Sequence, residues 1–532
     1  MTEVAKYKDE LLTDELMSKA HFYDINAEES EIQKFYNGQT VFITGGTGFL
    51  GKIIIEKLLR VTKVKQIYLL VRPKKNVRPQ KRLEHMLDDP VFERLKQHSL
   101  KSLDKMDVLE GDLEEADLGL SDKDKKKIVD EVTIVFHSAA TVRFNENLKI
   151  ATRINVCGTK ETLALGHHIK NLQAFVYVST AFSHCPQKEI GEQFYQSPVD
   201  VDQLLTLKDV LNEEQLDTLT PLLLNEWPNT YVFTKAAAEE VVRKGAPGLP
   251  LSVVRPAIIT TTYNEPLPGW IDNLYGPGGI VVGAAAGVLR TIHCDEGVQA
   301  EIVPGDMAGN CILAAAWDVA KRYSADPTLR DLERMRSSSD VPVYNFCLRP
   351  GTISWGKMTQ LLFHFGFQNP PYRALMSCDL TLNSSKLAHR IYMILFHYFP
   401  AYTIDLITGF FGKSKGLVKM YQKIEVFTWL LGYFAARSFN FSSDNVRSLY
   451  HDKLSQRDKE LFNFDLSSID WSEYMRIYYL GTRKYLMKDD PSTIPAARVK
   501  YNRLHIMNQT IKVCMSLVPF LILYFVIYAV FL

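Results

Sequence analysis

Residues 41–59 read Val41-Phe-Ile-Thr-Gly-Gly-Thr-Gly-Phe-Leu-Gly-Lys-Ile-Ile-Ile-Glu-Lys-Leu-Leu59, and this stretch decides the fold. An apolar, β-rich run breaks into glycines and resumes with helical character, which predicts a strand, a tight turn and a helix. The glycines at 45, 48 and 51 let the backbone turn sharply and let a pyrophosphate approach the N-terminus of the helix. We therefore expect a dinucleotide site at which Gly45, Thr47, Gly48, Phe49 and Gly51 contact the cofactor.

Two other interpretations of the glycine stretch have to be weighed. Residues 46–52 also match most of a P-loop, but that motif needs Ser or Thr next as a magnesium ligand, and Ile53 follows instead. A glycine turn without any ligand stays open on these residues alone, because G-x-G-x-x-G is a weak signal. The rest of the chain has to show which of these interpretations is correct.

Composition describes a large globular protein without a strong charge of either sign. The 532 residues are 46% hydrophobic and 23% charged, enough for two or more domains with large cores. Lys and Arg number 62 against 61 Asp and Glu, so no general field attracts nucleic acid. The seven cysteines are scattered with no C-x-x-C pair and no metal-ligand spacing, which predicts free thiols, a reducing compartment and no metal site.

Characteristic residues follow each further predicted strand. Arg72 follows a strand at 66–71, Asp112 lies at the end of a strand that begins at Met106, Ala139 ends a strand at 131–140, and Thr180 ends one that begins at Ala174. Strands that alternate with helices pair in parallel, and ligands bind beyond their C-terminal ends. All these residues should therefore share one rim with the glycine turn, with Asp112 placed to accept from the adenine amino group.

Arg72 selects between the two nicotinamide cofactors. An Asp or Glu at this position would bind the ribose hydroxyls of NAD, whereas a guanidinium can bind a 2′-phosphate. The sequence therefore predicts NADPH as the cofactor. An ordinary solvated cation in a loop is the alternative.

The chemistry is predicted at Tyr231-Val-Phe-Thr-Lys235. A Tyr and a Lys four residues apart project from one helix face, so the ammonium can stabilise a phenolate and lower the pKa of the tyrosine. Lys235 would also bind the nicotinamide ribose. Tyr231 then serves as a proton donor and acceptor, with the Thr180 hydroxyl at a strand end upstream. An exposed Tyr beside a surface Lys is the alternative.

Together, these motifs resemble those of extended short-chain dehydrogenases/reductases. The segments Val254-Arg-Pro-Ala257, Glu265-Pro-Leu-Pro-Gly-Trp-Ile-Asp-Asn273 and Gly276-Pro-Gly-Gly279 are similar to signatures of insect and animal fatty acyl-CoA reductases. Further on, Asp470-Trp-Ser-Glu-Tyr474 and Gly481-Thr-Arg-Lys-Tyr-Leu486 resemble the end of that family's C-terminal domain. The likeness runs from about residue 32 through nearly the whole chain.

The resemblance implies an alcohol-forming reductase of long-chain fatty acyl-CoA. Its fold would be α/β, a Rossmann-like doubly wound parallel sheet with an inserted substrate region, a C-terminal mainly helical domain and a terminal transmembrane helix. The expected parts are a tail at 1–31, the NADP-binding domain at 32–345, the helical acyl-binding domain at 346–490, a basic linker at 491–510 and an anchor at 511–532. Thr180 and Tyr231 would hold the oxyanion, and Pro256 would contact the cofactor.

The C-terminal residues predict a membrane anchor. Residues 513–532 carry no charge over the length that a bilayer core requires, and Arg498, Lys500, Arg503 and Lys512 precede them. We expect a lipid bilayer as a partner, with the catalytic part cytosolic on the endoplasmic reticulum, or on the peroxisome as the alternative. A buried terminal helix is the other interpretation.

A second apolar stretch occupies residues 391–411. His397, Pro400 and Asp405 count against a lipid-exposed span there. We expect a helix pair that lies at the membrane interface or around an acyl tunnel, with plain core or a spanning helix as alternatives.

Three hypotheses of function remain at this point. The first is an NADPH-dependent acyl-CoA reductase. The second is an extended reductase that acts on a sterol, another lipid or a nucleotide sugar, and the third is a membrane-tethered Rossmann protein without activity. Tyr231 and Lys235 count against the third, and the apolar C-terminal half counts against a sugar.

Overall fold

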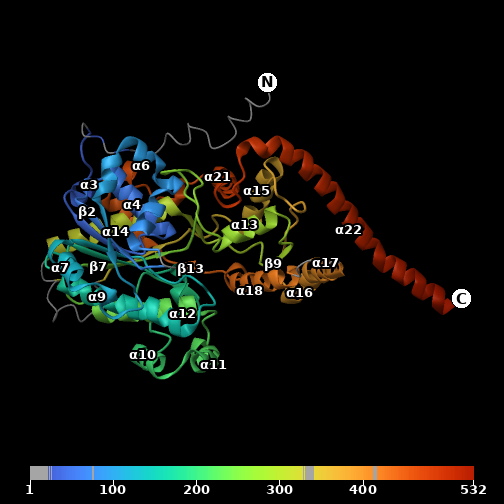
Figure 1. The fold of residues 1–532 in the computed structure, drawn as a ribbon, viewed down its shortest axis with the longest axis horizontal. Coiled ribbons are helices and arrows are strands. Elements are labelled where there is room, and N and C mark those ends of the chain that lie inside the picture. The colour runs from blue at the N-terminus through green and yellow to red at the C-terminus, as the bar shows by residue number, and fades with distance from the viewer. Residues whose placement is uncertain are drawn as a thin grey trace.

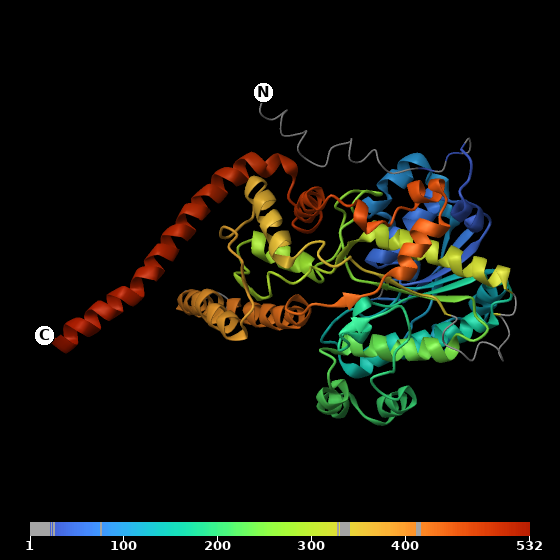
Figure 2. The same ribbon diagram turned by 180° about the vertical axis from the view of Figure 1, so that it is seen from behind.

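The computed structural model describes Phe22, Asp24, Leu329 and residues 27–74, 77–326, 341–410 and 416–531, but not the side chains of 515–516 and 518–531. Most of the stretch expected as an N-terminal tail therefore lies outside the described residues. Figures 1 and 2 show an α/β unit, a second part built mainly from helices, and a long C-terminal helix that projects from it.

A seven-stranded parallel sheet forms the centre of the α/β unit. Its spatial order is β11-β7-β5-β4-β1-β2-β3. The bounds are β1 (Thr40–Thr44), β2 (Gln66–Val71), β3 (Met106–Glu110), β4 (Ile134–His137), β5 (Ala174–Val178), β7 (Leu251–Pro256) and β11 (Val343–Phe346). This order places β1 between β2 and β4, as in dinucleotide-binding folds, so the predicted Rossmann-like doubly wound sheet is confirmed.

Helices cover both faces of the sheet. On one face α4 (Phe49–Val61) packs against α14 (Gly305–Ala325), and on the other α9 (Gly158–His168) packs against α12 (Thr230–Gly245). Two large apolar clusters lie between these helices and the strands, one on each side. Both faces are therefore buried, as the nearly continuous apolar strands require.

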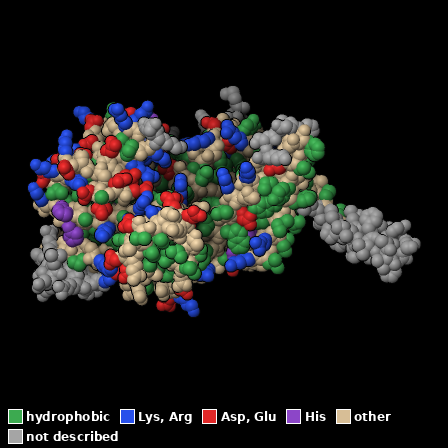
Figure 3. All heavy atoms as spheres, turned by 60° about the horizontal axis from the view of Figure 1, so that its bottom comes forward, with side chains coloured by type: hydrophobic (Ala, Val, Ile, Leu, Met, Phe, Trp, Pro, Cys, Tyr) green, Lys and Arg blue, Asp and Glu red, His purple; other side chains and the backbone are tan. Residues whose placement is uncertain are grey.

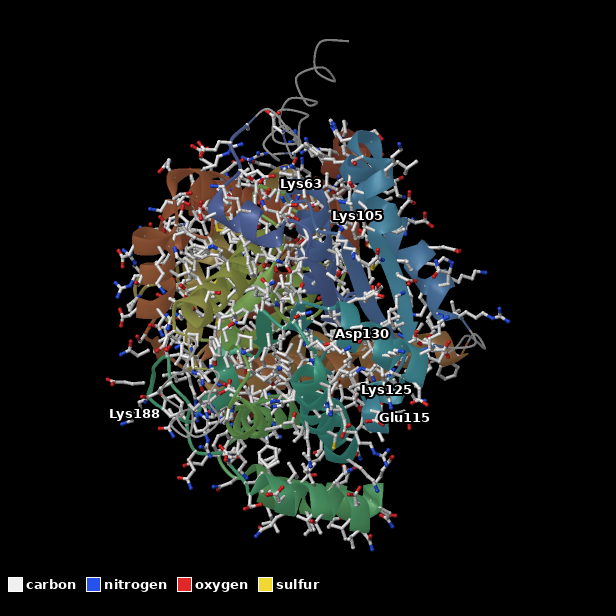
Figure 4. All side chains as sticks on the ribbon, turned by 90° about the vertical axis from the view of Figure 1, so that its left-hand side faces the viewer. Lys63, Lys105, Glu115, Lys125, Asp130 and Lys188 are labelled. Atoms are coloured by element: carbon white, nitrogen blue, oxygen red, sulfur yellow. The ribbon has the colours of Figure 1, made fainter. Side chains whose placement is uncertain are left out.

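The charged segment at 80–100 is divided between two helices. It forms α5 (Pro79–Leu87), a short 3-10 turn and α6 (Glu93–His98), because Pro90 cannot continue a helix and starts the turn instead. The lysine-rich run at 123–127 belongs to α7 (Asp122–Glu131), whose Lys125 and Asp130 lie on the outer surface in Figure 4.

The second part of the molecule is built mainly from helices. The helices that matter below are α13 (Pro277–Ala285), α15 (Trp355–Gln368), α16 (Lys386–Met393), the π-helical segment η9 (Ile394–Tyr398), α17 (Phe399–Phe410), α18 (Leu417–Ala435) and α21 (Trp471–Gly481). After α18 the chain returns to the α/β unit. There β13 (Asn440–Phe441) pairs with β6 (Glu189–Ile190), and the Asp458 carboxylate accepts a hydrogen bond from the Ile32 amide.

The C-terminal helix α22 runs from Ile494 to Phe531. Among the residues that the structure describes, no helix is long and apolar enough to span a bilayer. The predicted anchor at 511–532 falls mostly on residues whose side chains are outside that set, so it stays a prediction.

Candidate active site

The turn between β1 and α4 has the geometry of a phosphate cradle. Gly45 has φ of +78°, and a Cβ there would lie 2.7 Å from the Ala139 amide nitrogen. A Cβ on Gly51 would lie 2.3 Å from the Gly45 carbonyl oxygen. Gly48 is the N-cap of α4 and provides no side-chain cap, so the helix N-terminus is left for an anion. The residues present therefore fit a dinucleotide pyrophosphate.

Two other predicted cofactor residues of this turn have contacts of their own. The Phe49 ring stacks on Trp270 with centroids 4.9 Å apart, which ties the start of α4 to the loop before α13. The Thr47 hydroxyl accepts a weak hydrogen bond from Arg82 at 3.4 Å. Phe49 thus has a packing role in addition to its place in the turn.

Arg72 and Asp112 lie side by side beyond β2 and β3. An Arg72 guanidinium nitrogen lies 3.2 Å from the Glu114 carboxylate and 3.6 Å from that of Asp112. The Arg72 side chain is 47% exposed, so solvent weakens both ion pairs. The site thus offers a guanidinium whose present partners are easily exchanged.

Arg82 is a residue that the sequence did not indicate. It lies on α5, and its guanidinium donates a hydrogen bond to the Arg72 carbonyl oxygen at 2.6 Å. Burial, and secondarily the charge of Arg72, lower the pKa of Arg82. Within the described part of the chain no carboxylate forms an ion pair with Arg82. A partly buried cation without an anion, beside the glycine turn, suits a phosphate.

Ala139 and Pro256 complete the rim on the other side of the glycine turn. The Ala139 amide donates to the Thr44 hydroxyl at 3.3 Å, and the same hydroxyl lies 2.7 Å from His137 Nδ1. Pro256 is buried, ends β7 and is in register with Phe346. Along the sheet edge the predicted residues thus follow the strand order, from Asp112 after β3 to Pro256 on β7.

Thr180, Tyr231 and Lys235 meet at the end of β5. Asn229 caps α12 and thereby fixes the first turn that carries Tyr231. The Lys235 ammonium is buried, donates to the Val178 carbonyl oxygen at 2.8 Å and lies 4.4 Å from the centre of the Tyr177 ring. Tyr231 lies beside Thr180, whose hydroxyl opposes the effect of burial on the pKa of the tyrosine. The three predicted catalytic residues are therefore brought together.

The protonation of the pair differs from the expectation. Burial raises the pKa of Tyr231 to about 12, against the effect of the Thr180 hydrogen bond. Burial also lowers the pKa of Lys235 to about 7, although the Glu239 carboxylate opposes that shift. The prediction that Lys235 lowers the tyrosine pKa is wrong for this structure, because burial dominates and Lys235 is not among the groups that shift the pKa of Tyr231. Tyr231 stays protonated at neutral pH and is suited to donate a proton.

Glu239 lies behind the site and connects several buried polar side chains there by hydrogen bonds. This role was not identified from the sequence. The residue lies one helical turn after Lys235, and its carboxylate accepts hydrogen bonds from Ser179, Ser183 and Arg255 at 2.5–2.9 Å. Arg255 and His184 hold the pKa of Glu239 well below its usual range despite burial. The available signal was that Tyr231, Lys235 and Glu239 follow one another at intervals of four residues, which places them on one helix face.

An apolar cavity opens from Tyr231 into the helical part of the molecule. Its empty volume, including the opening, is about 1140 Å³. Phe144, Phe182 and Phe434 of α18 line it near Tyr231, and further walls come from α13, α15, α21 and α22, including Ala284, Gly366, Tyr479 and Tyr501. Such a cavity suits a long apolar ligand.

Two halves of the chain build the cavity wall next to Tyr231. The Phe144 ring stacks on Tyr231, with centroids 5.7 Å apart, and contacts Phe434 of α18 at the same distance. Phe182 meets Phe434 edge to face at 5.1 Å. The helical part therefore shapes the space beside the predicted proton donor.

Comparison with known proteins agrees with this arrangement. Two family models, both described as "Male sterility protein", match residues 43–312 and 396–489. The chain is 42% identical over 484 residues to "Fatty acyl-CoA reductase wat" of Drosophila melanogaster, which covers 91% of each chain. The chain belongs to the fatty acyl-CoA reductase family. Human "Fatty acyl-CoA reductase 1" is 37% identical over 89% of each chain.

Solved structures give the reductase a known fold. The reductase domain of a nonribosomal peptide synthetase from Mycobacterium tuberculosis superposes with a TM-score of 0.54 at 18% identity, over 91% of this chain and 99% of that one. The terminal reductase domain from the myxalamid pathway gives a TM-score of 0.53. At this identity the likeness concerns the fold alone.

Proposed function

We propose that this reductase converts a long-chain fatty acyl-CoA into the corresponding fatty alcohol and releases CoA, with NADPH as the reductant. The observation that carries the proposal is the position of Tyr231. Its hydroxyl neighbours Thr180 on the rim that holds the glycine turn, and its ring lines the apolar cavity. A thioester carbonyl can thus lie at the rim while its acyl chain occupies the cavity.

The reaction requires two reductions. When bound, the nicotinamide cofactor supplies the hydride for each of them. The first addition gives a hemithioacetal, which loses CoA thiolate and leaves an aldehyde, and the second gives an alkoxide. Thr180 and Tyr231 donate hydrogen bonds to the oxygen on which negative charge develops, and one such donor changes turnover by about 100- to 1000-fold.

The raised pKa of Tyr231 fits the direction of this reaction. A phenol that is protonated at neutral pH can give its proton to the alkoxide, which is the more basic group. The Lys235 ammonium is held by the Val178 carbonyl oxygen, and the Glu239 carboxylate favours its charged form, so it can bind the nicotinamide ribose.

The choice of NADPH rests on Arg72 and Arg82. Two guanidinium groups at the end of β2, one exposed and one partly buried, supply the donors and the charge that a ribose 2′-phosphate requires. We also propose that residues 511–532 anchor the chain in the endoplasmic reticulum or peroxisome membrane with the catalytic part cytosolic. This proposal rests on the uncharged run and on the basic residues that precede it.

The test uses the purified full-length protein with NADPH and a series of acyl-CoAs, with alcohol and aldehyde read by mass spectrometry. We expect alcohol from long-chain substrates, and at least a hundredfold slower turnover in Tyr231→Phe. Tyr275→Phe, which removes a hydroxyl from an exposed loop residue, is the matched control. Absence of both products at every chain length would refute the proposal.

A further inference from the structure

One end of the helical part exposes many large apolar side chains to solvent. We call this surface the outer face. It consists of large apolar side chains on α16, η9 and α17 that are 43–85% exposed: Leu387, Ile391, Ile394, Leu395, Phe399, Tyr402, Ile404, Leu406, Ile407 and Phe410. Figure 3 shows hydrophobic side chains gathered at this end of the molecule. A patch of this kind on a soluble surface marks a binding site.

The uncharged polar groups and the carboxylate of the same stretch are hydrogen-bonded within the protein. His397 is fully buried, and its Nε2 accepts a hydrogen bond from the Arg290 amide at 2.8 Å. The Asp405 carboxylate caps the N-terminus of α18, where it accepts from the amides of residues 416–418. Thr403 is exposed, but its hydroxyl donates to the Phe399 carbonyl oxygen of its own helix. The outer face therefore presents almost no group that needs water.

Basic side chains flank the outer face. Lys386 and Arg390 of α16 and Lys419 and Lys423 of α18 are exposed. Within the described residues none of the four has an ion-pair partner. An apolar strip bordered by cations matches the two layers of a bilayer surface, acyl chains below and anionic headgroups above.

We infer that α16, η9 and α17 insert in the plane of a lipid bilayer through the outer face. A protein partner is a poorer match, because protein interfaces carry about one hydrogen bond per 100–200 Å² and this strip offers almost no donors or acceptors. In Figures 1 and 2 these helices project from the α/β unit toward the side on which α22 ends. The insertion is separate from the anchor at 511–532 and goes beyond the reductase activity.

The position of α18 connects this surface to the catalytic cavity. The helix packs against α17, and its first turn donates backbone hydrogen bonds to the Asp405 carboxylate of α17. Near its last turn, the Phe434 ring contacts Phe144, which lies beside Tyr231. One helix therefore connects the outer face with the wall of the cavity beside Tyr231.

The experiment uses the full-length protein with vesicles of phosphatidylcholine and phosphatidylserine that contain a phospholipid with a photoactivatable acyl chain. Lipid adducts are mapped by peptide mass spectrometry, so residues 386–410 are scored separately from 513–532. Phe399→Asp tests the outer face, and Leu100→Asp is the control. The exposed fractions of the two side chains are nearly equal, 67% and 66%, and Leu100 lies on the α/β unit.

We expect adducts on residues 386–410 of the wild type, and about tenfold fewer there in Phe399→Asp, since burial of one large apolar side chain is worth more than 1.4 kcal/mol. Leu100→Asp should not change them, and neutral vesicles should reduce them. Phe410→Asp, at a side chain that is 85% exposed, is a second probe. Turnover of detergent-dispersed acyl-CoA should be unchanged in both variants, which shows that they fold.

Adducts confined to residues 513–532 would overturn the inference. So would a concentration-dependent dimer that Phe399→Asp dissociates in the absence of lipid, because the outer face would then bind a second copy. If the wild type shows no turnover in detergent, the proposed reductase function fails, whereas the adduct map still decides whether the outer face meets lipid.

Discussion

Replacement of Arg82 by alanine tests how the reductase distinguishes NADPH from NADH. The Arg82 guanidinium is partly buried, has no carboxylate partner among the described residues and is fixed by the Arg72 carbonyl oxygen at 2.6 Å. It is therefore oriented before a phosphate arrives, and little side-chain entropy is lost on binding. The Arg72 side chain is 47% exposed, and it has to break its ion pairs with Glu114 and Asp112 before it can bind a phosphate. Arg82 should consequently contribute more than Arg72 to the free energy of NADPH binding.

The magnitudes follow from these environments. A hydrogen bond to a charged group contributes about 1.5–3 kcal/mol, so Arg82→Ala should raise the KM for NADPH about ten- to a hundredfold. For the exposed and already paired Arg72, about 1 kcal/mol, or roughly fivefold, is expected in Arg72→Ala. Arg72→Asp should raise the KM for NADPH more than Arg72→Ala does, since it adds a negative charge beside the phosphate.

The assay is the initial rate with each nicotinamide cofactor at a saturating acyl-CoA concentration. The KM for NADH should change less than about twofold in every variant, because NADH has no 2′-phosphate. Lys81→Ala, at an exposed cation on the same helix, is the control. An equal increase of the KM for NADPH and for NADH in Arg82→Ala would refute the reasoning and indicate that Arg82 has a packing role.

The other predictions concern catalysis, chain length and stability. Because the pKa of Lys235 lies near 7, kcat/KM should fall as the pH rises through about 7 and the ammonium loses its proton. A pH–rate profile without that limb would contradict the assignment, and Lys235→Ala should lose most turnover. Gly366→Leu should shift the preference to shorter acyl-CoAs, because a Cβ there already lies 3.2 Å from the Tyr479 ring. An unchanged chain-length profile would place the acyl group elsewhere. Glu239→Gln should destabilise the fold by about 3 kcal/mol in a denaturant titration, because it leaves the fully buried Arg255 unpaired. The wild type should lose the same stabilisation as the pH falls toward the depressed pKa of Glu239.

The rim of the sheet could be predicted from the sequence because its residues follow local patterns. Each strand is a short apolar run, and the parallel arrangement places every strand end on one edge. Gly45, Arg72, Ala139 and Thr180 were located in this way without any knowledge of distant contacts. The strand at 66–71 was predicted with the bounds that the structure has.

The cavity and the buried charges could not be predicted in the same way. Ala284, Gly366 and Phe434 belong to three helices that are far apart in the sequence, and only tertiary packing brings them to one space. Arg82 lies in a stretch whose charges resemble an ordinary solvated helix. The pKa of Tyr231 depends on desolvation, which the Y-x-x-x-K spacing does not contain.

The ring contacts of Phe434 with Phe144 and Phe182 limit which segments of the chain can be exchanged between related proteins. Phe144 and Phe182 belong to the segment that one family model matches, and Phe434 to the segment matched by the other. Neither segment encloses the apolar cavity alone. A half that carries the sheet, exchanged between relatives, would meet a foreign aromatic ring beside Tyr231, the proposed proton donor. Chimeras of this family should therefore be active only when both sides of that contact are transferred together.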